Sequence, residues 1–104
     1  MFDLWGVKAW KSTFNGANCE RAIFNQAMFF GVSFNDAKLC GAKCDGAEFR
    51  NCSFLKADLT NANIQNADLT NANLSEANLQ NVNMKNAKLS GMNYQIARDR
   101  GAIM

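Results

Sequence analysis

The sequence predicts an all-β repeat solenoid of the parallel β-helix type, and three observations support this fold class. Every fifth residue from Phe14 to Leu89 is apolar without exception. The residue two places before each of these centres is Ala, Val or Cys, apart from Ser12 at the start. Turn-forming pairs such as Asp45-Gly46 follow many of the centres. A short period held over this length indicates a repeat architecture.

Each five-residue unit is expected to be a short strand followed by a bend. In an α-helix, centres five residues apart would lie about 140° from one another around the axis, so they could not share a buried face. In an extended segment the small residue and the large residue lie two positions apart, and both point to the same side. The polar or glycine residues that follow favour a turn. Successive turns of one hand wind the chain into stacked coils with an apolar interior.

The clearest units lie between Ala57 and Asn81, beginning with Ala57-Asp58-Leu59-Thr60-Asn61. They resemble the pentapeptide-repeat family, whose unit is an Ala, an Asp or Asn, a Leu or Phe, and two variable residues. The resemblance covers residues 12–94 and implies a right-handed quadrilateral parallel β-helix of four to five coils, with four units in each coil. The chain departs from the family pattern at four apolar positions, which are Cys19, Cys44, Cys52 and Met92.

A coil of twenty residues predicts four interior columns and several exterior ones. The interior columns are Phe14, Phe34, Phe54, Leu74 and Tyr94; Cys19, Leu39, Leu59 and Leu79; Phe24, Cys44, Ile64 and Met84; and Phe29, Phe49, Leu69 and Leu89. On the outside, asparagines superpose in the same way, as Asn61 does on Asn81 and Asn73 on Asn93. We expect these stacked side chains to hydrogen-bond in ladders.

Both ends of the chain depart from the repeat and are expected to form short capping segments. Residues 1–13 contain Trp5 and Trp10 and form either a degenerate first coil or an amphipathic cap over the first full coil. The β-helix is expected over residues 14–94. Asp99 falls on a centre position, where an unpaired carboxylate is too costly to bury. Residues 95–104 are therefore expected to form a C-terminal cap, with a turn of helix, and a tail.

Length and composition agree with a single domain. The chain has 104 residues, no proline, no histidine and a formal net charge of +2. The N-terminus lacks a basic start followed by a sustained apolar run, so we do not expect a secretory signal. No apolar segment is long enough for a membrane span. Of the four cysteines, Cys40 is expected to point outward and the others inward. We expect the cysteines to be free thiols that fill core positions and not ligands of a metal site. Cysteines used in this way suit a reducing compartment, the cytoplasm.

The sequence predicts no enzyme. Histidine, the commonest general base and metal ligand, is absent. Carboxylates such as Asp58 and Asp68 lie at outward positions, and a rod with a filled core has no cleft to perturb them. We therefore expect no catalytic residue, no cofactor, no metal and no small-molecule substrate. The small net charge also argues against nucleic acid as a partner.

Outward apolar residues are the candidates for a binding surface. Ile23, Met28, Phe30 and Leu55 occupy outward positions, and Trp10 would lie one coil below Phe30. Such residues mark either a partner interface or a seat for the chain's own N-terminal segment.

Three functions are therefore considered. The first is a non-enzymatic interaction module or small structural scaffold that docks on a larger protein. The second is implied by the resemblance, because some family members look like duplex DNA and bind DNA gyrase; a charge of +2 and a short chain argue against it here. The third is a homodimer through a coil end, with Ile103 and Met104 as the candidate contacts.

Overall fold

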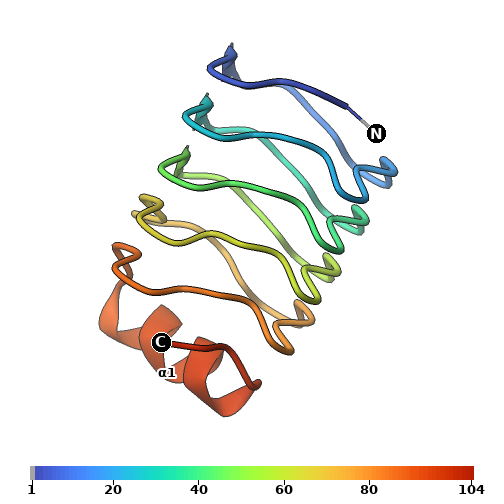
Figure 1. Ribbon diagram of the computed structural model, residues 1–104. Coiled ribbons are helices and arrows are strands. Elements are labelled where there is room, and N and C mark those ends of the chain that lie inside the picture. The colour runs from blue at the N-terminus through green and yellow to red at the C-terminus, as the bar shows by residue number, and fades with distance from the viewer. Residues whose placement is uncertain (1) are drawn as a thin grey trace.

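The computed structural model describes residues 2–104, and the chain winds into a short rod with extents of 29 × 21 × 21 Å (Figure 1). Each coil contains twenty residues, since Lys8 pairs in parallel with Met28 and Met28 with Glu48. Helix α1, Gly91–Asp99, lies across the C-terminal end of the rod. The fold is the predicted right-handed quadrilateral β-helix of four to five coils.

The coils are joined by parallel pairing on four faces. One face carries three regular strands, β1 (Lys8–Trp10), β2 (Met28–Phe30) and β3 (Glu48–Arg50), in the order β1-β2-β3. We call it the strand face, and it continues through the bridges Glu48↔Asp68 and Asp68↔Lys88. On each of the other three faces, single bridges join the coils. We name these faces by a central residue: the first face contains Phe14, the second Cys19 and the third Phe24. Examples of the bridges are, in the same order, Thr13↔Ser33, Asn18↔Lys38 and Asp3↔Ile23.

The N-terminal segment forms a coil. β1 pairs with β2 in full register, and Asp3 and Thr13 bridge to the second coil. Of the two alternatives that the sequence left open for residues 1–13, the described part, residues 2–13, therefore has the coil; Met1 lies outside the described residues. This segment continues the rod and leaves Trp5 and Trp10 about two-thirds exposed, at 64% and 62%.

The corners explain the polar residues of the repeat. Every fifth residue from Gly6 to Asn86 has φ between +52° and +71°, a left-handed conformation that glycine and asparagine adopt at least cost. In the unit around Asn61, Ala62 N–H donates to Leu59 C=O at 2.9 Å across the corner. A positive φ at the third residue of such a four-residue bend is the signature of a type II turn.

The core consists of side chains stacked along the rod. The rings of Phe14, Phe34 and Phe54 form one column, with centroids 5.0 and 5.2 Å apart, and neighbouring columns meet edge to face. Both arrangements are favourable for aromatic pairs. The interior columns occur as predicted up to Met84, which is 2% exposed, while Leu89 in the last coil is half-buried.

The end of the β-helix differs from the prediction. The repeat was expected to continue to Tyr94, but α1 begins at Gly91, where the Ser90 hydroxyl caps the helix by accepting Asn93 N–H at 3.1 Å. Tyr94 and Met92 consequently lie outside, at 47% and 75% exposure, while Asn93 is buried. A serine N-cap directly before a glycine overrides Met92 and Tyr94, two positions where the apolar period of the sequence still continues.

The predicted asparagine ladders are absent: no hydrogen bond joins two asparagine side chains within residues 2–104. Asn63 Oδ1 instead accepts Gln65 N–H at 3.1 Å, and Asn73 Oδ1 accepts Ser75 N–H at 2.9 Å. At these positions the short amide side chain reaches the backbone two residues ahead. Asn15 and Asn35, which directly follow a centre of the repeat, instead accept backbone N–H groups of the next coil.

Candidate interaction surface

The strand face carries two outward columns of contrasting character. The column before the buried centres is Lys8, Met28, Glu48, Asp68 and Lys88, and the column after them is Trp10, Phe30, Arg50, Thr70 and Ser90. In the first two coils three of the four side chains, Trp10, Met28 and Phe30, are apolar and only Lys8 is charged, whereas charged or polar side chains occupy the later coils. The face therefore changes from apolar to polar along the rod.

Trp10, Met28 and Phe30 form what we call the apolar patch. They are 62%, 40% and 39% exposed, and strand pairing places Trp10 directly beside Phe30. A shallow groove of about 160 Å³ runs between them, and its lining also includes Phe29, Glu48 and Arg50. Adjacent apolar residues around a groove are typical of a protein-binding surface.

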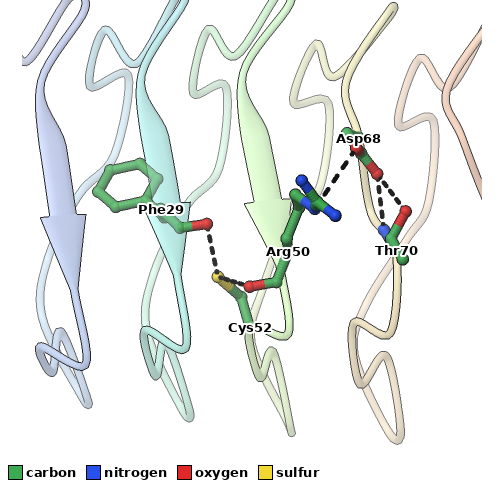
Figure 2. Close-up of polar contacts among 5 residues, drawn as sticks. All are labelled: Phe29, Arg50, Cys52, Asp68 and Thr70. Atoms are coloured by element: carbon green, nitrogen blue, oxygen red, sulfur yellow. Dashed lines mark hydrogen bonds and ion pairs between the residues drawn. The ribbon is translucent and has the colours of Figure 1, made fainter.

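A charged edge borders the apolar patch on the side of β3. Arg50 Nε lies 3.9 Å from Asp68 Oδ2 in the next coil, as Figure 2 shows. Asp68 also accepts hydrogen bonds from the Thr70 amide, at 2.9 Å, and from the Thr70 hydroxyl. Burial opposes ionisation of Asp68, but these hydrogen bonds and the charges of Lys88 and Arg50 hold its pKa below the ordinary value. The carboxylate thus stays charged at neutral pH, with the half-exposed Arg50 side chain beside it.

The structure separates the other two candidate residues from the apolar patch. Ile23 is half-buried on the third face, where it bridges to Asp3 and Lys43. Leu55 is half-buried on the first face, and its N–H donates to Asn35 Oδ1 at 3.1 Å. The five predicted surface residues therefore do not form one contiguous site.

The two ends of the rod differ. At the N-terminal end, Leu4 and Phe14 are half-buried, and a hollow of about 440 Å³ is lined by Phe2, Asn18, Glu20 and Arg21. At the C-terminal end, α1 contributes Ala97 to the core. After α1 the tail re-enters the β-helix: Ile103 bridges to Asn83, and Met104 packs partly against the core.

The four cysteines are free, and three of them fill the core. Cys19, Cys44 and Cys52 are buried, whereas Cys40 is partly exposed. Burial raises the pKa of Cys52 to about 11, and it raises those of Cys19 and Cys44 as well. The Cys52 thiol lies 3.6 Å from Phe29 C=O and 3.5 Å from Arg50 C=O (Figure 2). Throughout residues 2–104, no group of three His, Cys, Asp or Glu side chains could hold a metal ion.

Sequence reasoning missed the polar part of the surface and the polar groups that close the rod. Glu48 and Arg50 line the groove, but as ordinary outward charges they carried no signal of their own. Their twenty-residue spacing from Met28 and Phe30 could have placed them there. Asn93 and Arg100 donate to carbonyls of the last coil, at 2.9 and 2.8 Å, and only the position of α1 brings them to those atoms.

The coil, its corners and its stacked core define a repeat solenoid of the right-handed quadrilateral β-helix class. The chain matches the model of pentapeptide repeats over residues 3–39, 33–71 and 52–91, and it belongs to this family. The family's fold is generally a structural, non-catalytic one. No curated protein gave a significant sequence match. In the part of the chain that the structure describes, no helix has the length and apolarity needed to cross a membrane.

Solved structures of other pentapeptide repeat proteins resemble this one. HetL, involved in heterocyst differentiation regulation in the cyanobacterium Nostoc sp. strain PCC 7120, is 21% identical with a TM-score of 0.66; the match covers 83% of this chain and 38% of HetL. QnrB1, a plasmid-mediated fluoroquinolone resistance protein, is 23% identical with a TM-score of 0.47, covering 85% of this chain and 60% of QnrB1. A thylakoid lumen protein from Arabidopsis thaliana is 22% identical with a TM-score of 0.42, covering 95% and 81%. The chain thus spans less than half of HetL, and that similarity supports the fold.

Proposed function

We propose that this protein is a non-enzymatic interaction module, a small scaffold that docks on a protein partner through its strand face. The observation that carries the proposal is the apolar patch. Trp10, Met28 and Phe30 lie together at outward positions, which are polar in most of the repeat. The exposed surface of these side chains is not needed to hold the coils together, because the buried centres and the backbone pairing hold them. Binding of a partner would remove this apolar surface from water.

The composition of the groove indicates the kind of partner segment it would accept. Aromatic residues and Met are enriched in the cores of protein interfaces, and arginine is enriched with them. Glu48 and Arg50 border the apolar patch with one charge of each sign. We therefore propose a partner segment with an apolar anchor beside polar or charged groups. The free buried thiols support a reducing compartment, such as the cytoplasm, as the place of this interaction.

The test compares partner binding by the wild-type chain and by the double variant Met28→Ser, Phe30→Ser. Each tagged protein is used to purify partners from the native source, and any protein retained by the wild type is then purified and its affinity measured. We expect the double variant to lose at least about tenfold in affinity, since two apolar anchors are removed. Undiminished affinity would contradict docking on the strand face.

A matched control separates loss of the surface from loss of the fold. The double variant Lys38→Ser, Lys43→Ser changes exposed residues on the second and third faces, and it should bind as the wild type does. The lysine control should unfold at the wild-type temperature because both side chains are exposed, and the patch variant should lose only a few degrees, because Met28 and Phe30 are exposed by 40% and 39% and lie outside the buried core. Equal loss of affinity in both would point to a general surface effect.

Binding to DNA gyrase by mimicry of duplex DNA is the weaker alternative. It requires a strongly acidic rod, and this chain has eleven basic and nine acidic residues. A supercoiling assay with purified gyrase tests it directly. We expect no inhibition by the wild-type protein, and inhibition at low micromolar concentration would favour this alternative over the docking proposal.

A further inference from the structure

We propose that a second copy of this chain docks on the open N-terminal end of the β-helix, with the two β1 strands paired antiparallel across a two-fold axis. Among residues 2–104, the sheet order β1-β2-β3 leaves β1 with a partner on one side only. The opposite end of the rod is closed by α1. An uncovered strand edge is a template for pairing with another chain. Dimer formation of this kind does not depend on the proposed protein partner.

The backbone of β1 presents donors and acceptors to the open end. Val7 C=O accepts an N–H of β2 at 2.7 Å, and Lys11 N–H donates to a carbonyl of β2 at 2.9 Å. Backbone groups alternate between the two sides of a strand, so those of Lys8 and Trp10 point away from β2. Ser12 Oγ donates to Trp10 C=O at 3.2 Å, which leaves that carbonyl a second lone pair.

The other faces of the first coil offer less for pairing. On each of them, the N–H of the residue after the centre is already held by a side chain of its own coil. These contacts are Trp5 N–H to Asp3 Oδ1 at 3.2 Å, Asn15 N–H to Thr13 Oγ1 at 3.2 Å, and Glu20 N–H to Asn18 Oδ1 at 3.1 Å. β1 is therefore the segment of the open end with the most backbone groups left for a partner strand.

An antiparallel register centred on Ala9 uses all of these groups. It places Lys8 opposite Trp10 of the second copy as a hydrogen-bonded pair, and the two-fold axis repeats the pair, which gives four backbone hydrogen bonds. Each lysine ammonium then lies beside an indole ring, a favourable cation–π neighbour. Met28 and Phe30, the other residues of each apolar patch, lie on β2 immediately behind β1.

Charges at the open end are compatible with this two-fold axis. The axis passes through the strand face and the second face, so Asn18 lies opposite Glu20 of the second copy. Next to the corners, the same axis places Lys11 opposite Val7 and Arg21 opposite Ala17 of the second copy. Charges of like sign therefore do not oppose one another, and the half-buried side chains of Leu4 and Phe14 are covered.

The size of the end predicts a weak dimer. A cross-section of 21 × 21 Å offers roughly 400 Å² per copy, about half of what each partner buries in a standard interface. Association should therefore depend on concentration, with a dissociation constant above the nanomolar range.

The test is a dilution series of the isotope-labelled 104-residue chain, followed by NMR and sedimentation equilibrium. We expect the mass to approach that of a dimer at high concentration and the amide signals of Lys8 and Trp10 to shift most. A monomer at every concentration would overturn the proposal. Shifts confined to α1 and Ile103, or to residues remote from the first coil, would overturn it in favour of another contact.

Two variants at one position test the backbone pairing. Lys8→Pro removes the N–H that faces the open end, and proline is tolerated on an exposed strand edge. We expect it to weaken dimerisation by about tenfold or more, because each copy loses a donor. Lys8→Ala keeps the N–H and should dimerise within about threefold of the wild type, since only the exposed side-chain contact is lost. Equal dimerisation of Lys8→Pro and the wild type would count against the proposal. If Lys8→Pro fails to fold, the dilution shifts of the native chain still test it.

Discussion

Asn93 Nδ2 donates a hydrogen bond to Ala72 C=O at 2.9 Å, in place of the backbone N–H that a further coil would supply. In the preceding coil the equivalent carbonyl, that of Cys52, accepts Asn73 N–H at 2.9 Å, twenty-one residues later. Asn93 N–H cannot make this bond because it donates to Ser90 Oγ. Its side chain therefore ends the ladder where α1 begins.

Replacing Asn93 by alanine should destabilise the protein. The substitution leaves Ala72 C=O without its donor at a buried position, which costs about 1–3 kcal/mol, and the better helix propensity of alanine offsets only part of this. Urea unfolding followed by circular dichroism measures the change. Gln95→Ala is the control, since Gln95 is exposed on α1 and bonds only Asp99. Equal destabilisation by both variants would mean that the contact with Ala72 contributes nothing.

The N-cap of α1 gives a second expectation. Ser90→Ala removes the hydroxyl that accepts Asn93 N–H, and we expect a loss of about 1 kcal/mol in the free energy of unfolding. Ser90→Asp restores an acceptor at the same place and should recover most of the loss. Thermal unfolding of the three proteins tests this order, which fails if the aspartate variant is as unstable as the alanine variant.

Corner strain is measurable at Asn61, where φ is +62°. Alanine at this position must adopt the left-handed conformation at a cost of about 1 kcal/mol, whereas glycine adopts it freely. We therefore expect Asn61→Ala to be less stable than Asn61→Gly, although glycine is normally the more destabilising of the two residues. The same pair at Asn63, an extended position with no positive φ, should show the reverse order in chemical unfolding.

Thiol reactivity should distinguish Cys40 from the other three cysteines. Cys40 is partly exposed, and burial, followed by the hydrogen bond and charge of Asp58, raises its pKa to about 11. At neutral pH we expect iodoacetamide to modify Cys40 slowly and the buried thiols hardly at all, because the thiolate is the reactive form. Intact mass should show one adduct on the folded protein and four in denaturant. Rapid labelling of four sites in the folded protein would contradict the packing of the core.

The same thiols predict a loss of stability in alkali. Burial raises the pKa of Cys52 to about 11 from 9.0, so the folded state holds its proton more tightly than the unfolded state does. The stabilisation from this group is constant below pH 9.0 and falls as the pH rises toward 11. Unfolding free energies measured across this range should decline less steeply in Cys52→Ala than in the wild type. An unchanged slope would show that Cys52 does not contribute.

The repeat could be predicted because each interior position depends only on its neighbours in the coil and in the stack. An apolar residue every five positions cannot form one face of a helix, and the short turn-forming pairs leave room only for a bend. The inward positions of Phe34, Leu59 and Ile64 follow from that spacing, and their columns follow from the twenty-residue coil that the family resemblance implies. All three are buried in the structure. Local rules suffice where every unit repeats the same environment.

The ends could not be predicted in the same way, because their residues have no neighbour on one side. Tyr94 matches the repeat, yet the Ser90 cap makes helix the better solution for residues that have no further coil to pair with. The asparagine ladders did not form because the side chains of Asn63 and Asn73 hydrogen-bond to the backbone two residues ahead and not to the stacked asparagine.

The sequence by itself determined the inward positions and the corners, since these arise from the five-residue period, and its resemblance to the pentapeptide-repeat family implied the twenty-residue coil that sets the buried columns. Only the tertiary structure decided which outward residues meet. Trp10, Met28 and Phe30 share the strand face because twenty residues return the chain to the same side, and Ile23 and Leu55 lie on other faces. It also decided that the two ends of the rod differ. Closing an end requires donors at particular carbonyls, which Asn93 and Arg100 supply on one side, while β1 keeps an uncovered edge on the other.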